Sequence, residues 1–229
     1  MRFVKNFACV FLKDISSIVI GDLHIGFEIE LIKQGINVAL MDKIITDLEV
    51  CKKKTKAKNI ILLGDVKHSI GFPKSRLEIK NLIKFFDFLK DSFEKIYVVK
   101  GNHDGRLEEI IKDERIKIYS SRGFFLSKYG FFHGNSYPIK NVISSRILFC
   151  SHVHSKYFLP KDKRIFEVRV YLIFKVKKEI NRSGKIVVIP PFSSIISGKD
   201  VEECINESII SNIVENSSIE ILTIDGIKI

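Results

Sequence analysis

Aspartate and histidine residues of this chain occur in short motifs that follow apolar stretches. Asp22 and His24 come directly after the apolar residues 18–20, and Asp65 follows the stretch 59–63. Side chains just past a strand end can face the carboxyl edge of a sheet, where α/β proteins place their ligands. Asp and His together suit a divalent metal, and one Asp can bridge two ions through its two oxygens. Each motif alone is more typical of a loop or turn.

A third motif, Gly-Asn-His-Asp, occupies residues 101–104 after the apolar stretch 96–99. Asn102 offers a neutral carbonyl oxygen to a metal ion. The adjacent His103, held by Asp104, can protonate a leaving oxygen as a general acid. A turn that uses Gly and Asn for their permissive backbone is the alternative interpretation.

Three further histidines complete the pattern. His133 ends a predicted strand over residues 129–132, and His152 and His154 follow residues 147–150. Two histidines two positions apart project to the same side and can each give a ring nitrogen to a metal. If the motifs were only turns, five separate turns after five predicted strands would have to carry these residue types by chance. We therefore interpret the motifs as one site. Two metal ions about 3.5–4 Å apart, joined by a carboxylate, form a clamp for phosphoryl transfer to water.

The elements that must position these residues alternate in the first half of the chain between β-branched stretches and stretches of helical period. This alternation is typical of β-α-β units around a sheet interior. We predict strands over residues 17–20, 59–63 and 96–99, and helices over residues 74–93 and 28–54, the second broken near Gly35. The later strands are predicted over residues 124–126, 130–133, 146–150, 166–176 and 185–189, with a terminal hairpin through Asp225–Gly226. Residues 201–218 are predicted as either helical or mobile. No repeat or linker divides the chain, so we expect one domain over residues 1–229.

The composition fits a globular protein. The 229 residues are 45% hydrophobic and 28% charged, which excludes a disordered chain or a membrane bundle as the main class. There is neither an apolar run of about 18 residues nor a signal-peptide pattern, so we expect a soluble, cytoplasmic protein that does not bind membranes. The cysteines lie far apart and predict reduced, buried thiols. They are Cys9, Cys51, Cys150 and Cys204.

The formal net charge of +11 has two interpretations. It favours attraction to polyanions such as nucleic acid, or equally it reflects the Lys-rich surface of a heat-adapted protein. Three basic clusters offer a track for a phosphate backbone, although such clusters are more often solvated faces. They are residues 52–54 with Lys56 and Lys58, Lys161 with Lys163 and Arg164, and Lys175 with Lys177 and Lys178.

The order of the five motifs resembles the calcineurin-like metallophosphoesterase superfamily, and the resemblance covers residues 22–154. It implies an α/β fold, a four-layer αββα sandwich of two facing mixed β-sheets flanked by helices. The implied metal ligands are Asp22, His24 and His154 for one ion, Asp65 as the bridge, and Asn102, His133 and His152 for the other. The resemblance also implies that His103 is the acid near the leaving group and that Asp104 orients it.

Departures from the family pattern indicate a branch. The last motif of the family usually opens with Gly, whereas Ser151 stands at this position here. His68 in the second motif, the segment 189–193 and Gly198 resemble the branch encoded beside DNA ligases or Lhr-type helicases, for which nucleic-acid processing is suspected. Lys67, His68 and Arg106 are candidates to reach a phosphate or to support a metal ligand. A surface ion pair is an equally weighted interpretation for His68 and Arg106.

The sequence therefore predicts a hydrolase of phosphoester bonds with two divalent metal ions. In this mechanism a hydroxide that bridges the two ions attacks a phosphodiester, and nucleic acid (DNA or RNA) and nucleotides are the candidate substrates. Mn²⁺ is our first expectation for the metal, with Zn²⁺, Fe²⁺, Ni²⁺ or Co²⁺ as alternatives. The alternative functions are a small-molecule phosphomonoesterase, an enzyme for cyclic nucleotides, or a non-catalytic binding scaffold of the same fold. No apolar seam indicates an oligomeric state.

Overall fold

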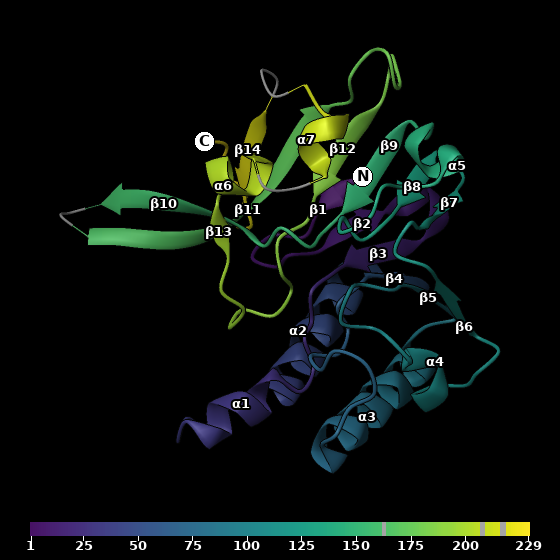
Figure 1. Ribbon diagram of the computed structural model, residues 1–229, viewed down its shortest axis with the longest axis vertical. Coiled ribbons are helices and arrows are strands. Elements are labelled where there is room, and N and C mark those ends of the chain that lie inside the picture. The colour runs from purple at the N-terminus through teal and green to yellow at the C-terminus, as the bar shows by residue number, and fades with distance from the viewer. Residues whose placement is uncertain (162–163, 207–208, 216–218) are drawn as a thin grey trace.

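A sheet with strand order β1-β2-β3-β4-β5-β6 forms the first half of the protein (Figure 1). The computed structural model describes residues 1–161, 164–206, 209–215 and 219–229. Strands β3 to β6 run parallel, whereas β1 and β2 pair antiparallel with each other and β2 with β3. The strands are β1 (Arg2–Phe3), β2 (Val10–Leu12), β3 (Ser17–Ile20), β4 (Asn59–Leu63), β5 (Lys95–Val99) and β6 (Ile116–Tyr119).

Helices cover the outer face of this sheet. The main ones are α2 (Leu40–Thr55) and α3 (Arg76–Ser92), preceded by α1 (Phe27–Lys33) and followed by the short α4 (Leu107–Ile110). A 3-10 turn, η1 (Lys13–Ile15), joins β2 to β3. Leu48 of α2 and Phe85 of α3 are completely buried in the core beneath the sheet. The predicted break near Gly35 is confirmed, because α1 ends at Lys33 and α2 begins at Leu40.

The second sheet has the order β13-β10-β11-β12-β9-β8-β7, and β14 also pairs with β11. Strands β8, β9 and β12 run parallel. The strands are β7 (Phe124–Leu126), β8 (Tyr129–Phe131), β9 (Ile147–Cys150), β10 (Ser155–Lys161), β11 (Arg164–Lys175), β12 (Lys185–Val188), β13 (Lys199–Asp200) and β14 (Glu220–Thr223). Its outer core includes residues of α5 (Lys140–Ile143), α6 (Val201–Asn206) and α7 (Ile210–Ile213).

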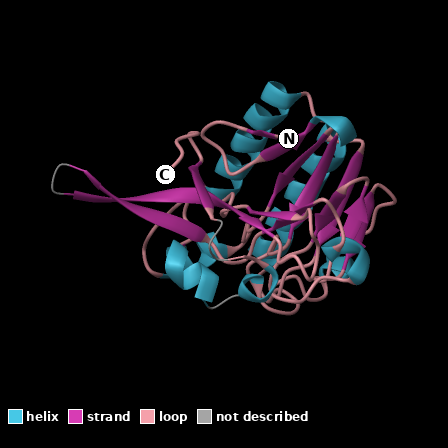
Figure 2. Cartoon of the chain, turned by 90° about the horizontal axis from the view of Figure 1, so that it is seen from above, coloured by secondary structure: helices cyan, strands magenta, loops and turns pink. Residues whose placement is uncertain are grey.

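The two sheets face each other across a shared core of aromatic and aliphatic side chains. Ile61 and Leu63 of β4 belong to the same buried cluster as Phe131 of β8 and Phe149 of β9. Because each sheet also carries helices on its outer face, the layers follow the order helix, sheet, sheet, helix (Figure 2). The predicted fold, two facing mixed sheets flanked by helices, is confirmed.

The carboxyl ends of the parallel strands of both sheets meet at one edge of the sandwich. In the first sheet the register pairs Ile20 with Leu62 and Leu62 with Val98, so β3, β4 and β5 end side by side. In the second sheet Phe131 pairs with Phe149. All five predicted motifs therefore begin at this edge.

Several secondary-structure predictions are confirmed and one long element is missed. The strands predicted over residues 17–20 and 59–63 have the predicted bounds, and a turn at residues 224–226 follows β14 as expected. Residues 201–218, predicted as helical or mobile, contain the helices α6 and α7. Residues 207–208 and 216–218 lie outside the described residues. Strand β11 corresponds to the strand predicted over residues 166–176, whereas β10, its partner in the hairpin that extends away from the body in Figure 1, is the missed element. Pro160 interrupts its first strand in the sequence, and a Pro argues against a strand.

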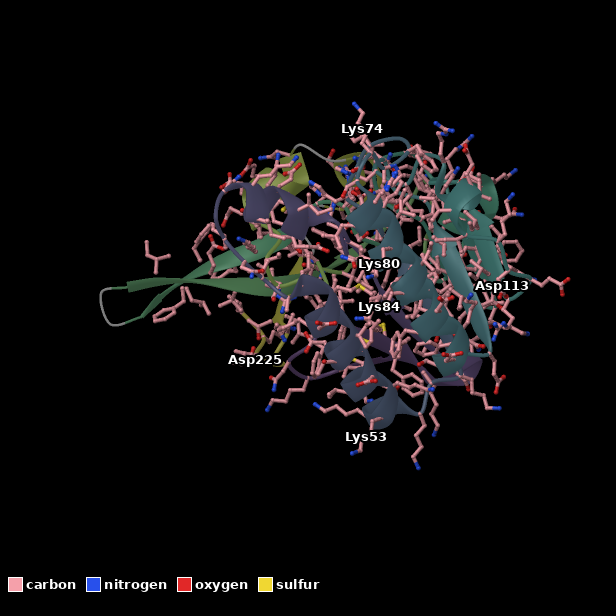
Figure 3. All side chains as sticks on the ribbon, turned by 90° about the horizontal axis from the view of Figure 1, so that it is seen from below. Lys53, Lys74, Lys80, Lys84, Asp113 and Asp225 are labelled. Atoms are coloured by element: carbon pink, nitrogen blue, oxygen red, sulfur yellow. The ribbon has the colours of Figure 1, made fainter. Side chains whose placement is uncertain are left out.

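The basic clusters do not form one track toward the motif-bearing edge. Residues 52–58 lie just before the start of β4 and so at the opposite, amino edge of the sheet. Lys52 and Lys54 contact the rings of Phe93 and Phe7, and Lys58 pairs with Glu94. Figure 3 shows Lys53 far from Lys74, which precedes α3. The side chains of Lys161, Lys163 and Arg164 lie outside the described residues, and Lys175 is at the end of β11.

Two other sequence expectations concern the cysteines and the membrane. All four cysteines are free and buried, as predicted. Among the described residues, the helices are too short or too polar to cross a bilayer.

Candidate active site

The first group of candidate ligands brings together Asp22, His24 and His154. Asp22 and His24 follow β3, and His154 lies between β9 and β10. One ligand atom of each residue lies within 4.8 Å of the others. The His154 Nε2 atom is 3.6 Å from Asp22 Oδ1, and the rings of His24 and His154 meet edge to face at 5.4 Å. Residues 132 positions apart in the chain thus form one compact group of oxygen and nitrogen donors.

A second group consists of Asp65, His133 and His152, whose ligand atoms also lie within 4.8 Å of one another. The His133 Nε2 atom is 3.4 Å from Asp65 Oδ2, and the His133 and His152 ring centroids are 4.8 Å apart. The same Asp65 oxygen lies 3.8 Å from His24 Nε2 of the first group. Asp65, a member of the second group, therefore also lies beside the first, as the predicted bridging role requires.

Hydrogen bonds fix the direction of the ligand side chains. His133 Nδ1 donates to the carbonyl oxygen of Leu63 at 2.7 Å, which leaves Nε2 to face Asp65. The Asp22 carboxylate accepts a hydrogen bond from the backbone N–H of His152 at 3.0 Å. Such bonds on the far side of a ligand set its tautomer and orientation.

Ser151 contributes to the same network. Its hydroxyl donates to the carbonyl oxygen of Leu63 and lies 3.4 Å from Asp22 Oδ1. A methyl group on Gly21 would lie 2.7 Å from the Ser151 Cβ, so a larger residue at position 21 would clash with it. In the sequence, Ser151 was notable only because the family usually has Gly at this position. Its contacts could not be predicted from that difference.

The free nitrogen atoms test whether this arrangement fits metal ions. Both ring nitrogens of His24, Nε2 of His133 and Nε2 of His154 are buried without a hydrogen-bond partner among the described residues. Unpaired buried polar atoms are rare because each is costly to desolvate. These nitrogens surround two carboxylates, and such a mixed donor set fits divalent ions of the Zn²⁺ or Mn²⁺ type. The residues present thus fit a metal centre.

The electrostatics keep most of the donors in the form that binds a metal. Burial lowers the pKa of both His24 and His152 to about 4, so these rings are neutral at pH 7. Burial raises the pKa of the Asp65 carboxyl, but the nearby His133 outweighs it and the pKa lies below its usual range. Burial alone would lower the pKa of His133, yet the carboxylates of Asp65 and Asp22 raise it to about 9.

Most candidate ligands occupy an unusual backbone conformation. The φ angles lie between +47° and +75° for a set of five ligands. Residues other than Gly rarely adopt this left-handed region, and such positions cluster at functional sites. Here the conformation turns the chain sharply at the end of each strand. The five are Asp22, His24, Asp65, His152 and His154.

Two glycines permit the close approach of the motif loops. A methyl group on Gly64 would lie 2.3 Å from His133 Nδ1, and one on Gly101 would lie 2.0 Å from Asp65 Oδ1. Any side chain at either position would displace a candidate ligand. Steric crowding therefore explains why Gly opens the second and the third motif.

The loop after β5 brings His103 to the site. The His103 backbone N–H donates to Asp65 Oδ1 at 2.9 Å, and the ring Nδ1 bonds the carbonyl oxygen of His68. The His103 ring meets that of His24 edge to face at 5.0 Å. Asn102 precedes it in the same loop and is exposed. Asn102 therefore belongs to the loop whose next residue bonds Asp65, and its role as a ligand stays a prediction.

Asp104 bonds the backbone of the site loops rather than the His103 ring among the described residues. Asp104 is completely buried, and its carboxylate accepts hydrogen bonds from the backbone N–H groups of Gly101 (2.9 Å), Lys67 (3.1 Å) and Val66 (3.3 Å). Burial raises its pKa. Asp104 therefore holds the backbone of the two loops together. The His103 ring bonds the His68 carbonyl oxygen instead.

The side chains of Lys67 and Arg106 are both engaged by other groups of the protein. Lys67 is completely buried, and its ammonium donates to the carbonyl oxygens of Ser69 and His103. Burial lowers its pKa. Arg106 is exposed and bonds both carboxylate oxygens of Glu109 at 2.7 Å. Lys67 therefore joins two site loops, and Arg106 forms the surface ion pair that was the alternative interpretation.

The His68 ring lies against the rings of His103 and His24. Its ring stacks on that of His103 at 5.6 Å with an interplanar angle of 29°, and its Nε2 lies 3.2 Å from Glu30. Ligand atoms of His24, His68 and His103 lie within 4.8 Å of one another. The ion pair weighed for His68 thus exists, but its ring is also part of the histidine cluster.

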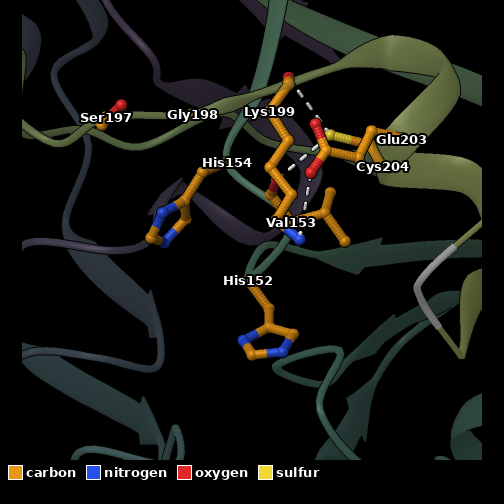
Figure 4. A pocket seen from close by; sticks show the side chains of 8 residues that line it. All are labelled: His152, Val153, His154, Ser197, Gly198, Lys199, Glu203 and Cys204. Carbon is orange, nitrogen blue, oxygen red and sulfur yellow. Dashed lines mark hydrogen bonds and ion pairs between the residues drawn. The ribbon is translucent and has the colours of Figure 1, made fainter.

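A cavity of about 460 Å³ adjoins the ligand loop between β9 and β10 (Figure 4). His152 and His154 line one side, and Lys199, Glu203 and Cys204 line another. The rings of His152 and His154 point away from Glu203 and Cys204 in Figure 4. Gly198 also lines the cavity, and a methyl group there would lie 2.0 Å from the His154 carbonyl oxygen. The segment before β13 therefore packs directly on the ligand loop.

Comparisons with known proteins agree with the fold and the motifs. The sequence pattern of the calcineurin-like phosphoesterase family matches residues 15–209. The chain belongs to this family, and it is a hydrolase that acts on phosphoester bonds.

Two solved structures are similar at low sequence identity, and the first of them shares the fold. A nuclease, MPE, from Pseudomonas putida is similar with a TM-score of 0.60 and 14% identity, over 95% of this chain and 89% of that one. Yfce, a phosphoesterase from E. coli, is similar with a TM-score of 0.38 and 16% identity, over 65% of this chain and 75% of that one. The comparison with curated proteins gives no match.

Proposed function

We propose that the protein is a phosphodiesterase with two divalent metal ions. Asp22, His24 and His154 would hold one ion, and Asn102, His133 and His152 the other, with Asp65 between them. The observation that supports this assignment is the pair of donor groups around Asp65, with unpaired nitrogens directed into them. When bound, the ions would supply Lewis acidity toward the phosphoryl oxygens and lower the pKa of water. Mn²⁺ is the ion that we expect first.

His103 is the proton donor in this proposal. Its Nδ1 atom is engaged by the His68 carbonyl oxygen, so Nε2 remains for the oxygen of the leaving group. His68 thus acts as a positioning residue through its backbone and its stacked ring. The buried Lys67 ammonium bonds the carbonyl oxygens of Ser69 and His103 and so links the loop after β4 to the loop after β5.

A diester fits the surroundings of the site better than a monoester. A diester carries an organic group on each side of phosphorus, and cavities lie on two sides of the histidine cluster. One adjoins His152 and His154, and the other adjoins His68. The net charge of +11 favours a polyanion such as nucleic acid.

We further propose that the chain belongs to the branch encoded beside DNA ligases or Lhr-type helicases. The segment that carries the resemblance packs on the site, because the Phe192 N–H donates to the Gly21 carbonyl oxygen at 2.9 Å. Arg169 donates to the carbonyl oxygens of Pro191 and Phe192 at 2.7 and 2.9 Å. The segment thus supports the residues next to Asp22.

The test compares bis-p-nitrophenyl phosphate with p-nitrophenyl phosphate as substrates. The purified protein is stripped of metal, reloaded with Mn²⁺ and assayed beside the Asp65→Asn variant. We expect a preference for the diester and loss of both metal and turnover in the variant. A preference for the monoester would instead establish a phosphomonoesterase. No turnover on either ester with two metal ions bound would indicate a binding scaffold.

A further inference from the structure

A second cavity, of about 310 Å³, opens beside His68. It lies between α1, the loop after β4 and the start of α3, and Lys33, Ile70, Phe72 and Lys74 are among its lining residues. It shares no lining residue with the cavity at His152 and His154. The two cavities thus reach the histidine cluster from different sides.

The position of His103 assigns this cavity to the leaving group. The His68 ring lines the cavity and stacks on the His103 ring at 5.6 Å. A proton donor must lie near the oxygen that departs. In the proposed reaction the departing part of the substrate therefore leaves on the His68 side.

The cavity wall carries two exposed apolar side chains. Ile70 is 77% and Phe72 is 38% exposed, and both belong to the loop between β4 and α3. The Arg106 guanidinium lies 5.0 Å from the centre of the Phe72 ring and is itself fixed by Glu109. The ring is thus held beside the cavity, where a flat ligand can stack on it.

Two lysines supply positive charge to the same cavity. Lys33 and Lys74 have neither an ion pair nor a side-chain hydrogen bond within the described parts of the chain, and Lys74 extends outward in Figure 3. The carboxylates of the lining are already engaged. Glu78 accepts a hydrogen bond from the Ser69 N–H at 2.9 Å, and Glu30 pairs with His68. Lys33 and Lys74 are therefore the charged groups of the lining that have no partner among the described residues.

We propose that this cavity binds the leaving-group side of a single-stranded polynucleotide. A base stacks on Phe72 and Ile70, and the next phosphate along the strand binds Lys33 and Lys74. Proteins that bind single strands without reading their sequence combine aromatic side chains on which bases stack with cations that bind the backbone. This proposal rests on the proposed phosphodiesterase function and extends it to a substrate class.

The test uses the Mn²⁺-loaded protein and two hexamers, hexathymidylate and the same strand without bases. We expect the wild type to have a KM about fivefold or more lower for hexathymidylate, from the stacking of one base. Phe72→Ala should remove this preference by raising KM for hexathymidylate, with a smaller effect on kcat. Phe72→Leu should restore only part of it, because Leu keeps the apolar contact without the ring.

The lysines are tested by salt dependence. For the double variant Lys33→Ala and Lys74→Ala, the slope of log(1/KM) against log salt should be less steep by about 1.4, since each contact to a single strand contributes about 0.7. The matched control is Lys5→Ala with Lys53→Ala, which removes the same charge from positions that do not line the cavity. The control should keep the wild-type slope.

The outcomes separate this proposal from the proposed function. A wild type that hydrolyses bis-p-nitrophenyl phosphate but not hexathymidylate overturns the polynucleotide proposal alone. The same holds if Phe72→Ala keeps the preference for bases, or if both double variants change the salt slope equally. Failure on bis-p-nitrophenyl phosphate overturns the phosphodiesterase function itself.

Discussion

At the scale of single residues, His103 separates catalysis from metal binding. Its ring bonds the His68 carbonyl oxygen, and its backbone, rather than its side chain, holds Asp65. We expect His103→Ala to keep both metal ions and to lose turnover by about 10²–10⁴-fold, the usual contribution of a general acid. Metal content by mass spectrometry and kcat on bis-p-nitrophenyl phosphate measure the two effects.

The variant to compare with His103→Ala is Asp65→Asn. Asp65→Asn should lose metal and turnover together, because Asp65 lies between the two ligand groups. Turnover of His103→Ala within a few fold of the wild type would contradict its role as the acid. Loss of metal from His103→Ala would place the residue among the ligands instead.

Lys67 is the residue on which the geometry of the two site loops depends. Its ammonium satisfies the carbonyl oxygens of Ser69 and His103, and Met has a similar length without the donor. We expect Lys67→Met to lower the free energy of unfolding by about 1–3 kcal/mol, because buried acceptors lose their partner. It should also lower kcat, because the loop that orients His103 loosens.

The control for Lys67 is an exposed lysine. Lys53→Met, on the last turn of α2, should change the free energy of unfolding by less than about 0.5 kcal/mol. Urea unfolding and the steady-state kinetics of both variants provide the measurements. Equal stability of the two variants would show that the Lys67 ammonium does not hold the loops.

Residue identities were predictable at this site to the extent that chemistry fixes them. A carboxylate or imidazole after a strand end is recognisable, so the sequence named every member of the two ligand groups. The contacts between loops were not predictable from the sequence, because they depend on the direction in which each side chain points. Asp104 and Lys67 were singled out from the sequence, but their partners became visible only in the fold.

At the scale of elements, the strands next to the site were the easiest to predict. β3 and β4 are buried β-branched stretches that end at Gly, and both have the predicted bounds. The hairpin of β10 and β11 was harder, because only β11 reads as a clear strand. Its partner begins directly after His154 and contains Pro160, and tertiary pairing overrides that local signal.

The loop after β5 gives a prediction at this scale. A methyl group on Gly101 would lie 2.0 Å from Asp65 Oδ1, whereas one on Gly105 would make only ordinary contacts of 3.6 Å or more. We expect Gly101→Ala to cost about 1–3 kcal/mol of unfolding free energy through overpacking, and to lower metal content by displacing Asp65. Gly105→Ala should retain the metal ions.

These two glycines lie in one loop, so the pair isolates the steric effect. Thermal unfolding and metal content of both variants are the measurements. If Gly101→Ala binds metal as the wild type does, the close packing of the loop on Asp65 is not required. If both variants lose metal, the loop needs flexibility rather than space at position 101.

At the scale of the whole molecule, the shared core between the sheets favours one folding unit over residues 1–229. Phe149 of the second sheet and Ile61 of the first belong to one buried cluster. We expect a single unfolding transition, and Phe149→Ala should lower the free energy of unfolding by about 3–5 kcal/mol without splitting it. Tyrosine fluorescence and circular dichroism in urea should coincide, and two separated transitions would indicate two domains.

Metal removal should also act on the whole molecule, because the candidate ligands come from both sheets. Asp22 and Asp65 follow strands of the first sheet, and His133 and His152 follow strands of the second. Bound ions would therefore join the two halves of the sandwich at the carboxyl edge. At free Mn²⁺ about 100 times its dissociation constant, binding adds about 2.7 kcal/mol to the free energy of unfolding and raises Tm by about 5–10 °C.

Calorimetry of the chelated and the Mn²⁺-loaded protein measures this shift. Asp65→Asn should unfold at the same temperature with and without Mn²⁺, since the residue between the two ligand groups is lost. Lys53→Met, which leaves both groups intact, should show the full shift. An equal Tm for chelated and loaded wild-type protein would mean that the ions do not join the sheets. Because the polar edge carries buried nitrogens without partners, we expect the chelated protein to be the less stable form.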